Sequence, residues 1–123
     1  MAAGPFLVFG LGEILWDLFP EGKILGGAPA NFAYHARVLG DEGIPASRVG
    51  TDALGREIRL RLSELGVPDR QVQSDPSRPT GTVQVELDSR GVPAFTITPE
   101  VAWDYLEWSG ELAALAGRTD AVC

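Results

Sequence analysis

The sequence predicts an α/β fold, and two patterns along the chain support that prediction. Up to residue 66, short apolar runs alternate with segments of helical periodicity in the order strand, helix, strand, helix. That order is typical of a parallel sheet covered by helices. From residue 80, apolar and polar residues alternate strictly, which predicts a hairpin with one polar face. Such a hairpin indicates two strands that leave the main sheet and cover another part of the protein.

The first strand and the first helix follow from the apolar pattern of residues 5–39. The continuous apolar run "PFLVFG" (5–10) is typical of a strand buried on both faces. The helix is expected from about Pro29 to Leu39, with the proline in its first turn and Gly40 as a left-handed C-terminal cap. Its predicted buried face consists of Phe32, Ala33, Ala36 and Leu39.

A second strand and a second helix repeat this arrangement. Residues 45–50 predict a short strand, and the helix after it has Asp52 as its N-cap and Gly66 as its stop. The apolar stripe of this helix consists of Leu54, Ile58, Leu62 and Leu65.

The last third of the chain has three predicted parts. The hairpin covers residues 80–97 and turns at "DSRG". Residues 101–117 return to helical spacing with a break at Ser109–Gly110. Residues 121–123 look like the beginning of a strand, in which Cys123 is expected to be a buried small apolar residue. A sheet cut here would leave an unpaired edge, so we expect the chain alone to be marginally folded or to self-associate.

Composition excludes several classes of protein. The 123 residues fit one domain or a piece of one, and a formal net charge of −7 disfavours a nucleic-acid surface. One cysteine excludes an internal disulfide framework and fits a reducing compartment. The first 19 residues lack a basic segment, and Glu13 and Asp17 interrupt their apolar run. We therefore expect a cytoplasmic protein with no signal peptide or membrane span.

The stretch "GGAPANFAYHARVLG" (26–40) contains the first candidate binding residues. Paired glycines before a helix let the backbone approach a ligand closely, although a tight turn would also explain Gly26 and Gly27. Asn31 gains nothing from helix propensity, but its amide offers two donors and an acceptor, which suits a sugar hydroxyl. The alternative for Asn31 is a polar residue that braces the loop.

Asp17 is the second candidate, since it follows the first strand region among apolar neighbours. Ligand sites in open α/β sheets lie outside the carboxyl ends of the strands, so Asp17 is either a hydroxyl acceptor or a surface residue. Trp16 beside it is suited to line a sugar pocket. His35 is the single histidine, which excludes a His-based metal cluster. The sequence contains no GxxxxGK[ST] phosphate loop, and "GLGEIL" (10–15) lacks the third glycine of a dinucleotide fingerprint.

Four stretches together resemble the N-terminal part of the ribokinase-like carbohydrate kinases of the phosphofructokinase B type, in particular their bacterial fructokinase-like branch. They are "GLGEILWDLFP" (10–20), "GGAPANFAYHARVLG" (26–40), "RVGTDALGREIRLRLSELGV" (48–67) and "PTGTVQVELDSRG" (79–91). The resemblance implies a three-layer α/β/α domain with a small β-sheet lid over the sugar site. Residues 1–123 would be the N-terminal portion of that domain, with lid strands at about 13–25 and 80–97.

The resemblance also implies roles for individual residues. Asp17 and Asn31 would bind sugar hydroxyls, and Gly26 and Gly27 would be hinge glycines flanking the sugar. Phe95 in the hairpin is assigned to the same substrate site. Relatives often carry an arginine after the second lid strand, where this sequence has Pro99, so the sugar itself is not specified.

The implied activity is ATP-dependent phosphorylation of a primary hydroxyl of a small sugar, with ATP and Mg²⁺ as cofactors of the parent enzyme. The family's Gly-Ala-Gly-Asp motif and its Asn-x-x-Glu magnesium motif are absent from the sequence. The catalytic base and the ATP-binding portion are therefore expected downstream of Cys123, with no catalytic or metal-binding residue in this chain. Expected partners are a small sugar and a second copy bound through the lid strands, with no nucleic acid and no membrane. Two alternatives are a nucleoside kinase of the same superfamily and a non-catalytic sugar-binding or self-associating fragment.

Overall fold

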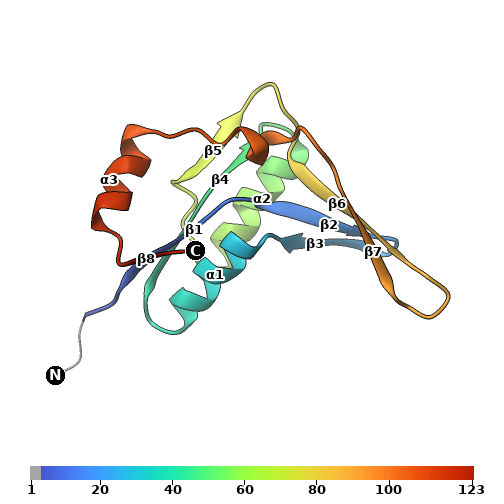
Figure 1. The fold of residues 1–123 in the computed structure, drawn as a ribbon, viewed down its shortest axis with the longest axis horizontal. Helices are drawn as coiled ribbons and strands as arrows, with labels where there is room; N and C mark the ends of the chain where they lie inside the picture. Colours follow the sequence, from blue (N-terminus) through green and yellow to red (C-terminus); the bar gives the residue numbers. More distant parts are fainter. Residues whose placement is uncertain (1–3) are drawn as a thin grey trace.

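The computed structural model describes residues 4–123, whose strands form two separate sheets (Figure 1). The first sheet has the order β5-β4-β1-β8, and each of its neighbouring pairs is parallel. Its strands are β1 (Leu7–Leu11), β4 (Glu42–Gly50), β5 (Val72–Asp75) and β8 (Ala121–Val122). The predicted parallel sheet is thereby confirmed.

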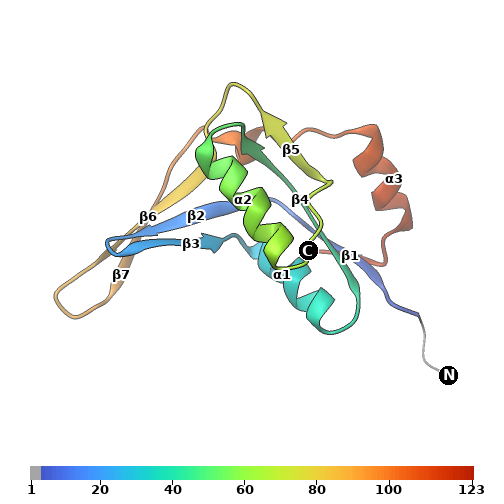
Figure 2. The same cartoon turned by 180° about the vertical axis from the view of Figure 1, so that it is seen from behind.

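Helices cover both faces of the parallel sheet, which gives three layers (Figures 1 and 2). The helices are α1 (Ala28–Val38), α2 (Ala53–Glu64) and α3 (Gly110–Arg118). On the α1–α2 side, Ile58 of α2 and Val49 of β4 belong to one apolar cluster. On the α3 side, Leu112 and Ile44 of β4 belong to a second cluster. Strand β4 is therefore buried on both faces, as its composition requires.

Helix α1 begins and ends one residue earlier than the sequence predicted. Pro29 lies in its first turn, and Gly40 follows its end with φ of +100°. Ala33 is fully buried, but Leu39 is 83% exposed, so its assignment to the buried face was wrong. The reason is that Leu39 lies beyond the last helical residue, where the chain has already turned away from the sheet.

Helix α2 has the predicted cap and the predicted apolar stripe. The Asp52 carboxylate accepts a hydrogen bond from the Gly55 amide at 2.9 Å, which satisfies one of the free N–H groups of the first turn. Ile58 and Leu62 are fully buried. Gly66 follows the helix with φ of +71°.

The second sheet has the order β3-β2-β6-β7 and extends away from the helices, at the right of Figure 1. We call it the projecting sheet. Its strands are β2 (Leu15–Phe19), β3 (Gly22–Gly26), β6 (Gly81–Leu87) and β7 (Pro93–Ile97). Two antiparallel hairpins, β2–β3 and β6–β7, are joined by a parallel β2–β6 pair.

The two faces of the projecting sheet have different surroundings. On one face, Trp16, Leu18 and Leu25 pack against the apolar cluster that includes α1 and α2. On the other face, Leu15 and Val83 belong to a small cluster of their own. Strand β7 is exposed along its whole length.

The segment before α3 differs from the sequence prediction. Only Ala102–Tyr105 form a single 3-10 turn, and helix α3 begins after Ser109, which caps it by accepting from the Leu112 amide at 3.0 Å. The prediction of helix from 101 to 109 was thus wrong beyond that turn. Residues 106–109 instead lie extended along β5, where Gln73 exchanges hydrogen bonds with the backbone of Glu107.

The C-terminal strand forms as expected, but the prediction that Cys123 is buried was wrong. Its backbone pairs with β1 through Phe9 and Leu11, at 2.9 and 2.8 Å. Its thiol is exposed, because β8 is an edge strand over which none of residues 4–123 packs. Within the described residues, no helix has the length and apolar character needed to cross a bilayer.

Candidate functional site

A hollow of about 410 Å³ lies between the projecting sheet and the start of α1. The residues that line it come from β2 and the segment before it, the start of α1, β6, β7 and the 3-10 turn. Its lining residues are Glu13, Leu15, Asp17, Gly27, Ala28, Val83, Phe95, Ile97 and Trp103. Three of the five predicted site residues, Asp17, Gly27 and Phe95, are therefore brought together.

Asp17 is the central polar residue of this hollow. It lies in the middle of β2, opposite Ile24 of β3 and Val83 of β6, on an otherwise apolar face. Burial raises the pKa of the Asp17 carboxyl above its ordinary value. None of residues 4–123 donates a hydrogen bond to it. Its oxygens are therefore available as acceptors for a ligand.

Gly26 and Gly27 let the main chain lie close to the Asp17 carboxylate and the Glu13 carbonyl. A Cβ at Gly26 would collide with the Asp17 carboxylate. Gly27 has φ of +109°, and a Cβ there would collide with the Glu13 carbonyl. The close approach thus explains both glycines more fully than a turn alone, although Gly26 itself does not line the hollow.

Glu13 is a residue that the sequence analysis did not identify. Its Oε1 accepts a hydrogen bond from the Ala28 amide at 3.3 Å, at the first turn of α1. Gly27 is the N-cap of this helix and has no side chain to cap it. The sequence did contain a signal for this contact. Helix α1 has a glycine N-cap and no acidic residue in its first turn, so an acceptor for its free N–H groups has to come from another segment of the chain.

Asn31 does not line the Asp17 hollow. It lies one turn into α1, where its backbone N–H donates to the Gly27 carbonyl at 3.2 Å. The Asn31 residue is exposed. It lines a separate hollow of about 500 Å³ between α1, α2 and β3, together with Tyr34, His35 and Arg61. Of the five predicted site residues, Asp17, Gly27 and Phe95 therefore line one hollow, Asn31 lines the other, and Gly26 lines neither.

Comparison with known proteins identifies the family. Residues 21–121 match the family described as "pfkB family carbohydrate kinase". The chain belongs to this family. A fructokinase of Klebsiella pneumoniae is 44% identical over 92 residues, covering 70% of this chain and 30% of that protein. A putative sugar kinase of Pyrococcus horikoshii is 35% identical over 112 residues, covering 79% of this chain and 36% of that one.

Solved structures of pfkB-family kinases share the fold. The Pyrococcus horikoshii sugar kinase in complex with ATP superposes with a TM-score of 0.78 at 28% identity, covering 94% of this chain and 42% of that one. Fructokinase from Vibrio cholerae O395 superposes with a TM-score of 0.69 at 32% identity, covering 80% of this chain and 36% of that one. The expected ribokinase-like three-layer domain is confirmed. The chain spans about a third of the length of the curated relatives it matches.

In this pfkB-family chain, a buried junction fixes the base of β6 to the start of α2. Thr80 donates its hydroxyl to Asp52 Oδ1 at 2.5 Å and its amide to Asp52 Oδ2 at 2.9 Å. The same hydroxyl accepts from the Gly50 amide at 2.9 Å. Burial alone would raise the pKa of Asp52, but the hydrogen bonds from Thr80 and Gly55 outweigh it and lower the pKa. The junction therefore holds Asp52 ionised and the projecting sheet in place.

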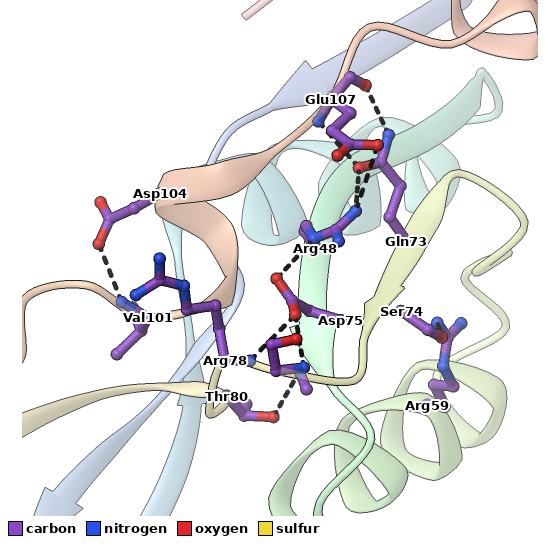
Figure 3. Close-up of polar contacts among 12 residues, drawn as sticks. Arg48, Arg59, Gln73, Ser74, Asp75, Arg78, Thr80, Val101, Asp104 and Glu107 are labelled. Carbon is purple, nitrogen blue, oxygen red and sulfur yellow. Dashed lines mark hydrogen bonds and ion pairs between the residues drawn. The ribbon is translucent and has the colours of Figure 1, made fainter.

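A second polar network stiffens the loop that leads into β6 (Figure 3). Arg48 donates to Asp75 at 2.9 Å, and Asp75 also accepts from the Ser77 and Arg78 amides at 2.8 and 2.9 Å. The bond from Arg48, followed by the bond from Ser77, lowers the pKa of the Asp75 carboxyl. The Arg78 guanidinium stacks on the Tyr105 ring at 3.9 Å. This network sets the position of the segment that carries Trp103.

Trp103 is the other lining residue that sequence reasoning missed as a site residue. It lies in the 3-10 turn and reaches the hollow beside Gly81, the first residue of β6. Helical periodicity gave no indication of this contact, since the segment was predicted to be a regular helix. Among residues 4–123, no group of three or more His, Cys, Asp or Glu side chains could hold a metal ion.

Proposed function

We propose that this chain is the sugar-binding, lid-bearing portion of an ATP-dependent kinase that phosphorylates a primary hydroxyl of a small neutral sugar such as fructose. The observation that supports this most is the unpartnered Asp17 carboxylate in a hollow of about 410 Å³ beside the start of α1. A hollow of this size lies within the usual range for small-molecule sites, about 300–1,000 Å³. The projecting sheet above it would act as the lid.

The chemistry of the lining residues favours a polyol. A carboxylate accepts hydrogen bonds from sugar hydroxyls, and the aromatic rings of Phe95 and Trp103 offer apolar surface to the C–H faces of a sugar ring. Gly27 lets the backbone lie close to the ligand. In this proposal Asp17 orients the sugar and the two rings exclude water from it.

The charge of the hollow favours a neutral sugar over a phosphorylated or acidic one. Its charged lining residues are Glu13 and Asp17, and no Lys or Arg lines it in the part of the chain that the structure describes. Two carboxylates would repel a sugar phosphate. A 6-phosphofructokinase of Thermoanaerobacterium thermosaccharolyticum is 29% identical over 100 residues, but the charge favours the chemistry of the fructokinase relatives.

In this proposal, residues 4–123 contribute to sugar binding and not to binding of ATP or Mg²⁺. The described residues contain no acidic cluster of the size a metal needs, and the sequence contains neither the Gly-Ala-Gly-Asp motif nor a phosphate loop. In a kinase, ATP·Mg²⁺ supplies the phosphoryl group and neutralises the charge that develops during transfer. We infer that these 123 residues supply sugar positioning, and that they do not phosphorylate a sugar by themselves.

A titration with fructose tests the proposed site. Asp17→Asn replaces the charged acceptor with a neutral amide, and we expect the dissociation constant for fructose to rise about ten- to a hundred-fold, because hydrogen bonds to a charged group are the stronger ones. Asn31→Ala tests the separate prediction that Asn31, which lines the neighbouring hollow, binds another sugar hydroxyl, and that prediction expects a similar loss. His35→Ala is the control on the same helix and should bind as the wild type does. Equal affinity of Asp17→Asn and wild type for fructose would refute the assignment, and tighter binding of a nucleoside than of fructose would favour a nucleoside kinase.

We also propose that a second copy covers the outer part of the projecting sheet. Four apolar side chains share one face with Asp17 by strand register and are 48% to 63% exposed: Ile24, Leu87, Phe95 and Ile97. Apolar surface on an edge strand favours pairing with another chain. Sedimentation equilibrium should show a dimer that Ile97→Lys converts to monomer, whereas a wild-type monomer at high concentration would contradict this arrangement.

A further inference from the structure

We propose that the indole N–H of Trp103 is a sugar-binding donor and helps to determine which sugar is accepted. This inference rests on the proposed function and assigns a new residue to the same hollow. Trp103 lines the hollow together with Asp17 and Phe95, although it comes from the loop between the projecting sheet and α3. A residue in that position would contact the ligand directly.

The hydrogen bonding of the three tryptophans separates Trp103 from the others. The indole of Trp16 donates to the Leu54 carbonyl at 3.0 Å, and Trp108 is 71% exposed and can donate to water. The Nε1 atom of Trp103 is buried and has no acceptor among residues 4–123. A buried N–H without a partner is costly, so native structures rarely retain one without a reason.

Trp103 has a hydrogen-bond donor without an acceptor, and the other polar side chains of the hollow offer acceptors to a ligand but no N–H donor. Its polar side chains, Glu13 and Asp17, are carboxylates that accept hydrogen bonds when ionised. Among the lining side chains within residues 4–123, Trp103 is the one with an N–H to donate. A sugar hydroxyl both donates and accepts, so it would be fully satisfied with its hydrogen on Asp17 and an oxygen lone pair toward Trp103. The pair therefore selects for hydroxyl-bearing ligands.

Gly81 explains how closely the indole edge of Trp103 lies against β6. A Cβ at Gly81 would lie 2.7 Å from Cδ1 and 3.1 Å from Nε1 of Trp103, so only glycine allows the indole edge to pack here. Because the Nε1 atom has almost no exposed surface, the proposal requires a small outward movement of β6 before a ligand oxygen can reach it. Binding at Trp103 would therefore couple sugar occupancy to the position of the projecting sheet.

Indole ¹⁵N–¹H spectra of the full chain test this proposal directly. The chain has three tryptophans, and Trp103→Phe and Trp108→Phe assign their signals. With fructose, we expect the Trp103 signal to shift and the Trp16 and Trp108 signals to stay in place. Trp103→Phe keeps an aromatic ring but removes the N–H, and its affinity for fructose should fall about three- to ten-fold. Trp108→Phe is the matched control and should bind fructose as the wild type does.

The outcomes separate this inference from the proposed function. If Asp17→Asn loses fructose binding while the Trp103 signal does not move and Trp103→Phe binds normally, the role of Trp103 is wrong and the sugar site stands. If the wild type binds no sugar, both are wrong. Loss of the Trp16 signal would reveal that Trp103→Phe does not fold. The wild-type spectrum then decides, because a spectrum in which none of the three indole signals moves at saturating fructose overturns the proposal.

Discussion

The two sheets of this molecule bury their residues in different ways. In the parallel sheet, β4 is covered on both faces, and Ile44 and Val49 have almost no exposed surface. In the projecting sheet, β7 is exposed from Pro93 to Ile97. The parallel sheet is thus explained by packing within the chain, whereas the outer face of the projecting sheet is not.

The same comparison separates two aspartates by their surroundings. A carboxylate on an apolar sheet face does not help folding, and burial raises the pKa of Asp17 because the charged form is disfavoured there. Asp52 has the opposite character, since hydrogen bonds from Thr80 and Gly55 hold its pKa low. One aspartate stabilises the junction between the sheets, and the other is free to bind a ligand.

Matched isoleucines in the two sheets should give the largest difference in stability. Ile44→Ala in β4 opens a cavity in a closed core and should lower the free energy of unfolding by about 2–5 kcal/mol. Ile97→Ala in β7 removes a side chain that is 62% exposed in the single chain, so at concentrations where the chain is monomeric it should change this free energy by less than about 0.5 kcal/mol. Urea denaturation followed by fluorescence measures both. Similar losses for the two variants would show that the projecting sheet is packed as tightly as the core.

Matched threonines at the base of β6 should give an intermediate difference. Thr80→Val removes the hydroxyl that bonds both Asp52 and the Gly50 amide, and we expect a loss of about 1–3 kcal/mol. Thr82→Val removes only a half-buried contact with Thr98 at 2.9 Å and should cost less than about 1 kcal/mol. Thermal unfolding compares them. Equal costs would mean that the junction does not fix the projecting sheet.

The two aspartates should respond to pH with opposite signs, and these effects are the smallest. The pKa of Asp52 is lowered by folding, so its stabilisation is complete above the unfolded value of 3.8 and is lost as pH falls through its lower folded pKa. The pKa of Asp17 is raised by folding, so its charge opposes folding once pH rises from 3.8 through the folded pKa. At pH 7, Asp52→Asn should lose about 1 kcal/mol and Asp17→Asn should gain less than about 1 kcal/mol.

Stability measured across pH checks this contrast. Both variants should converge on the wild type at pH values below the folded pKa of Asp52, where the carboxyl groups are protonated in the folded and the unfolded chain. A loss of stability for Asp17→Asn at pH 7 would show that Asp17 has a structural partner. The free-acceptor role proposed for it would then be wrong.

Local sequence signals predicted most of the fold. Pro29 and Gly40 located α1 to within one residue, Asp52 and Gly66 located α2, and strict alternation located the β6–β7 hairpin. These signals work because caps, turns and periodicity act within a few residues of each other. The exposure of Leu39 and Cys123 was missed, because it depends on where the chain turns and on what packs over an edge strand.

The site was predicted in part. Asp17 and Gly27 were candidates from their positions in the sequence before the resemblance assigned them a role, and together with Phe95 they line one hollow. Glu13 and Trp103 were missed because their contacts, to the Ala28 amide and to Gly81, join segments far apart in the sequence. No periodicity or motif encodes such contacts. They follow only once β2, β6 and α1 are placed relative to one another.

The central claim is that the hollow beside Asp17 binds the sugar, and mapping backbone amide shifts during a fructose titration tests it most directly. We predict that the amides of Asp17, Gly27 and Phe95 shift together with a single dissociation constant, while those of Tyr34 and Arg61 in the neighbouring hollow move far less. Fructose 6-phosphate should produce weaker shifts at the same residues, because Glu13 and Asp17 repel it. Shifts concentrated around Tyr34 and Arg61, with none at Asp17, would place the sugar in the other hollow and contradict the account.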